Sequence, residues 1–283
     1  MTHVLCGVLA GFFVLKILYL VRYCMSTSDR EVYATQPRPL LEQIHHLLEV
    51  VPSGPEAGEV VAAIVPDTNL LHAGRAAAAV YKTLQGRKYD TVILVAPSHT
   101  GPFGRIHICS VDEYPTILGG LRVNDQVRNE LCDEDDDIFL DNKGHFHTDG
   151  IDVQLPFLQT VLGSNFAIVP IIMGDESPDF CRELGHAIGE IMYSRRALLV
   201  ASANLLESVD EGVELFREHL ESGDVPRLMA LLNSGRVRVE GRGPLLVALI
   251  AAQHRKADNV QILDLEAPEE EFGGYLGAII IRN

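Results

Sequence analysis

Short runs of consecutive apolar residues, rich in valine and isoleucine, recur along most of the chain. Such runs are typical of strands that are buried on both faces of a parallel sheet. The clearest runs are 60–65, 91–96, 166–172 and 197–203, and weaker ones are 106–111, 260–265 and 275–281. Segments with helical spacing separate them, at 74–84, 153–162, 179–192, 209–220, 225–232 and 244–254. This alternation predicts an α/β fold with helices on both faces of a mainly parallel central sheet.

In sheets of this kind, binding and catalytic residues lie just beyond the carboxyl ends of the strands. The segments that follow the apolar runs contain carboxylate, imidazole and amide side chains, and they are 66–69, 97–100, 174–176 and 204–208. We expect the site residues to come from these segments. The interior of the sheet should instead be fully apolar, and we expect near-complete burial of Val92, Leu94, Val169 and Leu199.

The N-terminal residues differ in character from the α/β segment. Val4–Val21 is apolar apart from Lys16, and it falls just short of the ~20 residues that span a bilayer. Arg22 follows on its C-terminal side, and positive charges there keep the remainder of a chain in the cytoplasm. This segment is therefore a candidate membrane anchor for a cytoplasmic domain. Alternatively, Met25 begins a plausible soluble protein, and the preceding segment is absent from the mature chain.

The chain divides into parts of different composition. The hydrophobic segment occupies 1–24, and a polar arm with a first helix occupies 25–58. Apolar residues at helical spacing place that helix at 40–51, before a break that is rich in proline and glycine. The α/β domain then occupies 59–283.

Charge and motif content exclude several classes of function. Lys and Arg total 23 against 39 Asp and Glu, so the net charge is −16. An acidic domain repels a phosphate backbone, which excludes a nucleic-acid partner. No Walker loop is present and no G-x-G-x-x-G follows a strand, so a nucleotide cofactor has no support. The five cysteines form no C-x-x-C pair, and we expect Cys109 and Cys181 to be buried, unreactive thiols.

The strongest motif is VAPSHTGPFGR at 95–105, where an apolar strand ends in Pro-Ser-His. Together with further blocks in the same order, it resembles the Memo family, also called AmmeMemoRadiSam system protein B, over about residues 30–283. The other matching blocks are 66–82, 148–159, 168–174, 200–208, 240–249 and 275–280. The resemblance implies a three-layer αβα sandwich related to the class III extradiol dioxygenases.

The resemblance also implies a small metal site, which members of the family build from two histidines and a cysteine. Asp67 stands at the position of the first histidine, His99 keeps the second, and Glu240 stands at the position of the cysteine. Neighbouring pocket positions hold a histidine, an aspartate and a histidine in the family, and here they hold Asp149, Asn204 and Glu207. We expect these positions to cluster at one edge of the sheet.

The replacements change the chemistry that the site favours. A thiolate with two imidazoles suits iron or copper, whereas Asp67, His99 and Glu240 form a harder donor set that suits manganese, magnesium or non-haem iron(II). The alternative is a pocket without metal, in which Arg75 or Arg242 neutralises the carboxylates or in which a carboxylate is protonated. In that case His99 is an ordinary histidine at the sheet edge.

A second histidine-rich segment lies nearby in the sequence. In GHFHTDG the residues His145, His147 and Asp149 alternate, and in an extended segment they would share one face. That face could supply a substitute ligand to the site. The simpler alternative is a solvent-exposed loop.

Three hypotheses for function follow from these observations. The first is a non-catalytic Memo-like protein that binds a peptide or protein partner, because most site positions of the family are replaced. The second is a metal-dependent oxidoreductase that uses Asp67, His99 and Glu240 and keeps an open position for substrate or dioxygen. The third is a membrane-tethered scaffold whose working part is Val4–Val21.

Overall fold

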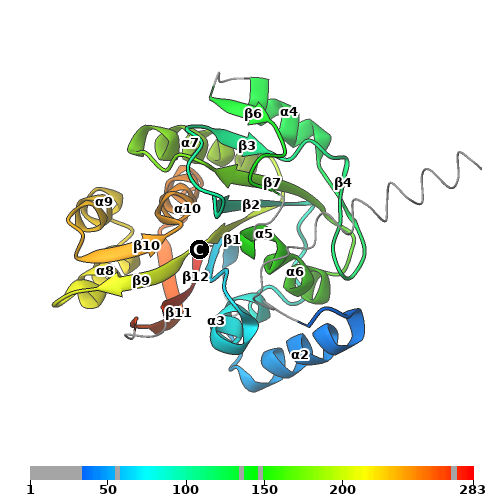
Figure 1. Cartoon of the computed structure of the whole chain (residues 1–283), viewed down its shortest axis with the longest axis horizontal. Coiled ribbons are helices and arrows are strands. Elements are labelled where there is room, and N and C mark those ends of the chain that lie inside the picture. Colours follow the sequence, from blue (N-terminus) through cyan, green and yellow to red (C-terminus); the bar gives the residue numbers. More distant parts are fainter. Residues whose placement is uncertain (1–33, 55–57, 134–136, 146–148, 269–272) are drawn as a thin grey trace, which may run out of the picture.

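The computed structural model describes residues 34–54, 58–133, 137–145, 149–268 and 273–283 (Figure 1). The apolar segment Val4–Val21 and His147 lie outside these residues. No helix formed by the described residues is long and apolar enough to cross a membrane.

A ten-stranded sheet runs through the centre of the molecule (Figure 1). Its strands are β1 (Glu59–Val65), β2 (Thr91–Pro97), β3 (Ile106–Ile108), β6 (Ile138–Leu140), β7 (Ala167–Met173), β8 (Ala197–Ser202), β9 (Asn204–Ser208), β10 (Val237–Glu240), β11 (Asn259–Glu266) and β12 (Gly274–Arg282). Their spatial order is β10-β9-β12-β1-β8-β2-β7-β3-β6, and β11 pairs with β12. Two short strands, β4 (Glu113–Tyr114) and β5 (Leu121–Arg122), pair separately.

The centre of the sheet is parallel, as the sequence predicts. β1 pairs with β8, β8 with β2, and β2 with β7, all in parallel register. Antiparallel pairing begins on either side, where β12 joins β1 and β3 joins β7. The segment 204–208, which the sequence suggests is a connecting segment, forms β9 and pairs antiparallel with β10 and β12. Because β9 contains polar residues, it does not form a continuous apolar run in the sequence.

The helices agree with the predicted periodic segments and add two short ones. They are α2 (Pro37–Val50), α3 (Leu70–Lys82), α4 (Asp125–Asp133), α5 (Asp149–Asp152), α6 (Gln154–Leu162), α7 (Pro178–Tyr193), α8 (Gly212–Glu221), α9 (Val225–Asn233) and α10 (Arg242–His254). α3 begins where it does because the side chain of Asn69 accepts a hydrogen bond from the backbone N–H of Leu71 at 2.8 Å.

Helices cover both faces of the sheet, which makes three layers (Figure 1). One core contains residues of α2, α3, α5 and α6, and the other contains residues of α4, α7, α8, α9 and α10. Side chains along β2 alternate between the two cores. The predicted interior residues Val92, Leu94, Val169 and Leu199 are at most 1% exposed, which confirms the prediction of a sheet covered on both sides.

The cysteines in the described part of the chain are free thiols. Cys109 and Cys181 are buried, as expected. Burial raises the pKa of the Cys109 thiol to about 11 and that of the Cys181 thiol to about 12. Both side chains therefore remain protonated at neutral pH and behave as small apolar groups.

Candidate metal centre

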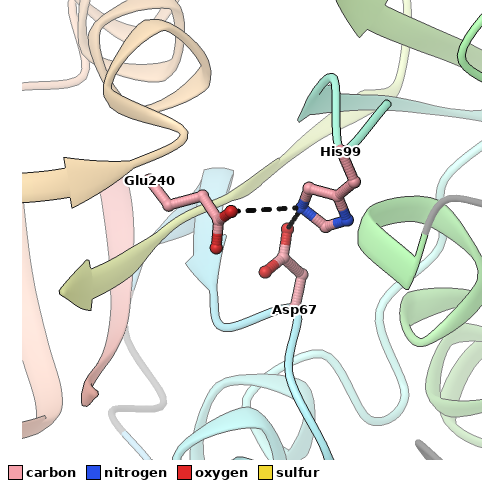
Figure 2. A group of neighbouring side chains, drawn as sticks. All are labelled: Asp67, His99 and Glu240. Carbon is pink, nitrogen blue, oxygen red and sulfur yellow. Dashed lines mark ion pairs between the residues drawn. The ribbon is translucent and has the colours of Figure 1, made fainter. Parts of the chain in front are cut away.

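Asp67, His99 and Glu240 meet at the carboxyl edge of the parallel strands (Figure 2). Asp67 follows β1, His99 follows β2, and Glu240 is the last residue of β10. One carboxylate oxygen from each acid and one imidazole nitrogen lie within 4.8 Å of one another. Nε2 of His99 lies 3.3 Å from Oδ2 of Asp67 and 3.9 Å from Oε1 of Glu240. The predicted convergence of these residues is confirmed.

Asn204 joins the two carboxylates by hydrogen bonds. It begins β9 and lies directly opposite Glu240 in the pairing of β9 with β10. Its Nδ2 donates to Oδ1 of Asp67 and, at 3.3 Å, to Oε2 of Glu240, while its Oδ1 accepts from the backbone N–H of Asp67 at 3.2 Å. These contacts also fix the orientation of the amide, because the opposite orientation would place its oxygen against two carboxylates.

A glycine allows Glu240 to approach the site. Gly241 has a φ of 73°, in the left-handed region. A Cβ atom there would lie 2.1 Å from the carbonyl oxygen of Ser202, which no real side chain permits. Only glycine therefore lets the end of β10 pack against the end of β8.

A buried glutamine holds the strand ends in place beneath the cluster. Gln154 is fully buried, and its Nε2 donates to the carbonyl oxygen of Pro66 at 2.9 Å and to Oγ of Ser202 at 3.3 Å. The hydroxyl of Tyr81 donates to Oε1 of Gln154 at 2.8 Å, and Oγ of Ser202 donates to the carbonyl oxygen of Gly150 at 2.6 Å. No motif in the sequence marks Gln154 as a site residue. The available signal was a polar residue among the apolar positions of the 153–162 segment.

Glu176 is a further acidic residue near the cluster that the sequence analysis did not single out. It follows β7, within the segment 174–176 that was expected at this edge. Its Oε2 accepts a hydrogen bond from the backbone N–H of Gly243 at 2.7 Å, in the first turn of α10. Burial raises the pKa of the Glu176 carboxyl, and the charges of Glu240 and Asp67 raise it further, whereas the Gly243 N–H and Arg242 oppose the shift.

Comparison with known proteins identifies the family. The sequence profile described as Memo-like protein matches residues 30–271. The chain belongs to the Memo-like family. A MEMO1 family protein from Saccharolobus solfataricus is 30% identical over 230 residues, which cover 76% of this chain and 81% of the relative. Another from Sulfolobus acidocaldarius is 31% identical over 199 residues, which cover 67% and 70% of the two chains.

A solved structure supports the fold. The crystal structure of an uncharacterized protein from Escherichia coli K12 matches with a TM-score of 0.51 and 15% sequence identity, over 78% of this chain and all of that one. Together with membership of the Memo-like family, this match is consistent with the αβα sandwich expected from the resemblance.

Glu207, which was expected in the pocket, has an ion pair of its own in this Memo-like protein. Its side chain is 63% exposed and pairs with Arg238 at 3.0 Å. The two residues are opposite each other in the β9–β10 pairing, beyond the end where Asn204 faces the site. Arg75 pairs with Asp264 at 3.9 Å rather than with the site carboxylates.

The alternative in which Arg242 neutralises the carboxylates stays a prediction. None of the ion pairs between described residues joins Arg242 to Glu240, although the two are close in sequence. Arg242 is exposed at the start of α10. The immediate partners of the two carboxylates are therefore the amide of Asn204 and the imidazole of His99.

The histidine-rich segment contributes one residue that can be described, and that residue lies in the interior. His145 is 1% exposed, and its Nε2 lies 3.0 Å from the carbonyl oxygen of His107. Burial lowers the pKa of His145 to about 4, so the ring is neutral at physiological pH. Asp149 begins α5, but its side chain, like His147, lies outside the described residues. Their role as substitute ligands stays a prediction.

The donor set fits a hard divalent cation. Asn204 occupies Oδ1 of Asp67 and Oε2 of Glu240, which leaves Oδ2 and Oε1 directed at His99 (Figure 2). Oδ2 of Asp67 is buried and accepts no hydrogen bond from a described residue. This oxygen lies 3.3 Å from Nε2 of His99, and a buried charge is stabilised by a paired group or by a coordinated cation. Two carboxylates and an imidazole suit manganese, magnesium or iron(II).

Proposed function

We propose that this Memo-like protein holds a divalent cation between Asp67, His99 and Glu240 and acts as a metal-dependent oxidoreductase on a small molecule. The observation that carries the proposal is the convergence of the three donor atoms within 4.8 Å, with the buried Oδ2 of Asp67 accepting no hydrogen bond from a described residue. The reaction class follows the resemblance to the extradiol dioxygenases.

The three ligands would have different duties. Asp67 is buried, with a side chain 1% exposed, and it anchors the cation at the floor of the site. The side chains of His99 and Glu240 are 20% and 39% exposed, so a small molecule can approach from their side. A bound iron(II) or manganese ion would supply Lewis acidity and electron transfer. Glu176, whose pKa is raised, is suited to hold a proton beside the site.

The alternative of a non-catalytic partner-binding protein rests on the sequence resemblance. The replacement of most of the family's site residues favours this alternative. The convergence of the replacements on one another favours the metal-dependent function instead. Manganese(II) is the preferred probe, because it suits this donor set and is less readily oxidised by air at neutral pH than iron(II).

The proposal is tested by manganese binding to metal-free protein at pH 7.5, measured by electron paramagnetic resonance. We expect one site in the parent, and we expect Asp67→Asn and Glu240→Gln to weaken binding by at least about tenfold. Loss of a group that merely orients a ligand already weakens metal binding by about 10- to 100-fold, and loss of a ligand should do no less. Affinity should also fall as pH decreases and the ligands become protonated.

Glu207→Gln is the matched control. It removes the same charge from an exposed side chain on the neighbouring strand, and we expect binding equal to that of the parent. Equal binding by Asp67→Asn and the parent would contradict the proposed centre. Tight binding of copper(I), which prefers soft thiolate and thioether ligands, would contradict the hard donor set. The oxidoreductase assignment further predicts dioxygen consumption by the iron(II)-loaded parent with an ortho-diol substrate, and none by Asp67→Asn.

A further inference from the structure

Asn204 makes hydrogen bonds to both carboxylates of the proposed centre. It is 6% exposed, and its Nδ2 donates to an oxygen of Asp67 and to an oxygen of Glu240. A primary amide nitrogen carries two hydrogens and an amide oxygen accepts. Each hydrogen therefore has its own carboxylate, and the oxygen receives the backbone N–H of Asp67 at 3.2 Å.

This arrangement keeps the two carboxylates together without a cation. Two like charges at this separation repel each other, and burial strengthens the repulsion. The amide offsets it, because each N–H group presents a partial positive charge to one carboxylate. The amide binds Oδ1 of Asp67 and Oε2 of Glu240. The other oxygens, Oδ2 of Asp67 and Oε1 of Glu240, point toward Nε2 of His99 at 3.3 and 3.9 Å (Figure 2). The donor set is assembled before a metal arrives.

The neutral side chain of Asn204 also adds no charge beside the three ligands, so it affects the total negative charge of the site. With a neutral imidazole, the ligands Asp67, His99 and Glu240 contribute two negative charges, which match a divalent cation. An aspartate at position 204 would have nearly the same shape. It would add a third negative charge beside the ligands and would remove the N–H groups that hold the other two carboxylates together.

We propose that Asn204 is the specificity-determining residue of this centre, which assembles Asp67 and Glu240 and restricts the site to divalent rather than trivalent cations. The inference rests on the proposed metal-dependent function and extends it to the charge of the cation. The role is one of positioning and charge matching, because the amide oxygen faces the backbone of Asp67 and not the donor atoms.

The test compares the affinities for Mn²⁺ and Tb³⁺ in the full-length parent and in variants, with Tb³⁺ measured by competition against Mn²⁺. In Asn204→Asp we expect the preference for Tb³⁺ over Mn²⁺ to rise by about tenfold or more, because the added charge attracts a trivalent ion more strongly. In Asn204→Leu, which has a similar shape without charge or donors, we expect both affinities to fall by about 10- to 100-fold, with their ratio unchanged. Asn165→Asp, at an exposed turn, is the matched control and should change neither affinity.

The outcomes separate this inference from the proposed function. A parent that binds neither ion overturns both. A parent that binds Mn²⁺, with an unchanged preference in Asn204→Asp or an unchanged Mn²⁺ affinity in Asn204→Leu, overturns only the role of Asn204. If circular dichroism shows that Asn204→Asp does not fold, the preference is measured in Asn204→Glu, which adds the same charge, and an unchanged preference there overturns the role. The ratio of the Tb³⁺ and Mn²⁺ affinities could also shift as much in Asn165→Asp as in Asn204→Asp. This result would overturn the proposed role of Asn204, because the shift would then come from the net charge of the protein.

Discussion

Glu176 links the segment after β7 to the first turn of α10 by a hydrogen bond, and it does so next to two other acidic residues. Its carboxylate accepts from the N–H of Gly243, while Asp67 and Glu240 raise its pKa in addition to burial. A carboxyl whose pKa is higher in the folded state contributes stability below its unfolded pKa of ~4.3, and loses that contribution as pH rises through the folded value. An ionised Glu176 therefore destabilises the metal-free protein near neutral pH.

We predict that Glu176→Gln stabilises the metal-free protein at pH 7, because glutamine keeps an acceptor for Gly243 but carries no charge. The gain should shrink as pH falls toward 4, where the glutamate is protonated. Urea unfolding in the presence of a chelator measures the effect across this range. Glu190→Gln, at an exposed position on the following helix α7, should change stability little. A variant that is less stable than the parent at pH 7 would show that the charge of Glu176 is needed.

His145 makes the stability of the fold sensitive to acid. Its pKa is lowered by burial to about 4, whereas in the unfolded chain it is ~6.5. The unfolded state therefore binds the proton more readily between these values, so the stabilising contribution is present above pH ~6.5 and is lost as pH falls toward 4.

Between pH 7 and pH 5 the parent should lose about 2 kcal/mol that His145→Gln does not lose. Denaturant unfolding at the two pH values measures this difference, and each protein is compared with itself. His186→Gln, which alters an exposed histidine, should leave the pH dependence as in the parent. An identical pH dependence in His145→Gln and the parent would exclude His145 as its source.

At the scale of elements, α6 is connected to β1 and β8 by the side chain of Gln154. Gln154→Leu preserves the size of the side chain but leaves the hydroxyl of Tyr81 and the carbonyl oxygen of Pro66 without this partner. We expect a loss of about 1–3 kcal/mol for the buried polar groups left unsatisfied, and a weaker Mn²⁺ affinity because Asp67 follows Pro66. Gln159→Leu, at a half-buried position of the same helix whose side chain contacts Thr116 and Gly119 instead of the strand ends, should bind Mn²⁺ normally. Unchanged stability in Gln154→Leu would refute this connection.

At the scale of the whole molecule, the N-terminal segment should be dispensable for folding. The match to the Memo-like family begins at residue 30, after this segment. Deleting residues 1–24 should therefore leave the melting temperature nearly unchanged and should preserve Mn²⁺ binding. A large decrease in melting temperature would mean that the segment packs against the domain. Membrane fractionation of the full chain tests the anchor separately.

Much of this architecture can be predicted from the sequence, because the signals are local. Continuous apolar runs such as 91–96 identify strands that are covered on both faces, and the intervening helices follow from their spacing. The rule that sites form at carboxyl ends of parallel strands then selects Asp67 and His99. Glu240 could be selected only through the family resemblance, because β10 is short and alternates in polarity.

The rest of the site depends on tertiary structure. The sequence alone determined the α/β class, the central strands and the types of donor at the site. Only the folded chain decided which polar residues face one another, because β9 and β10 are distant in sequence and their pairing sets Asn204 opposite Glu240 and Glu207 opposite Arg238. Whether a polar residue of these strands becomes a ligand, a bridging amide or part of an exposed ion pair depends on the face of the sheet that its side chain occupies. That choice depends on strand register, which long-range packing decides.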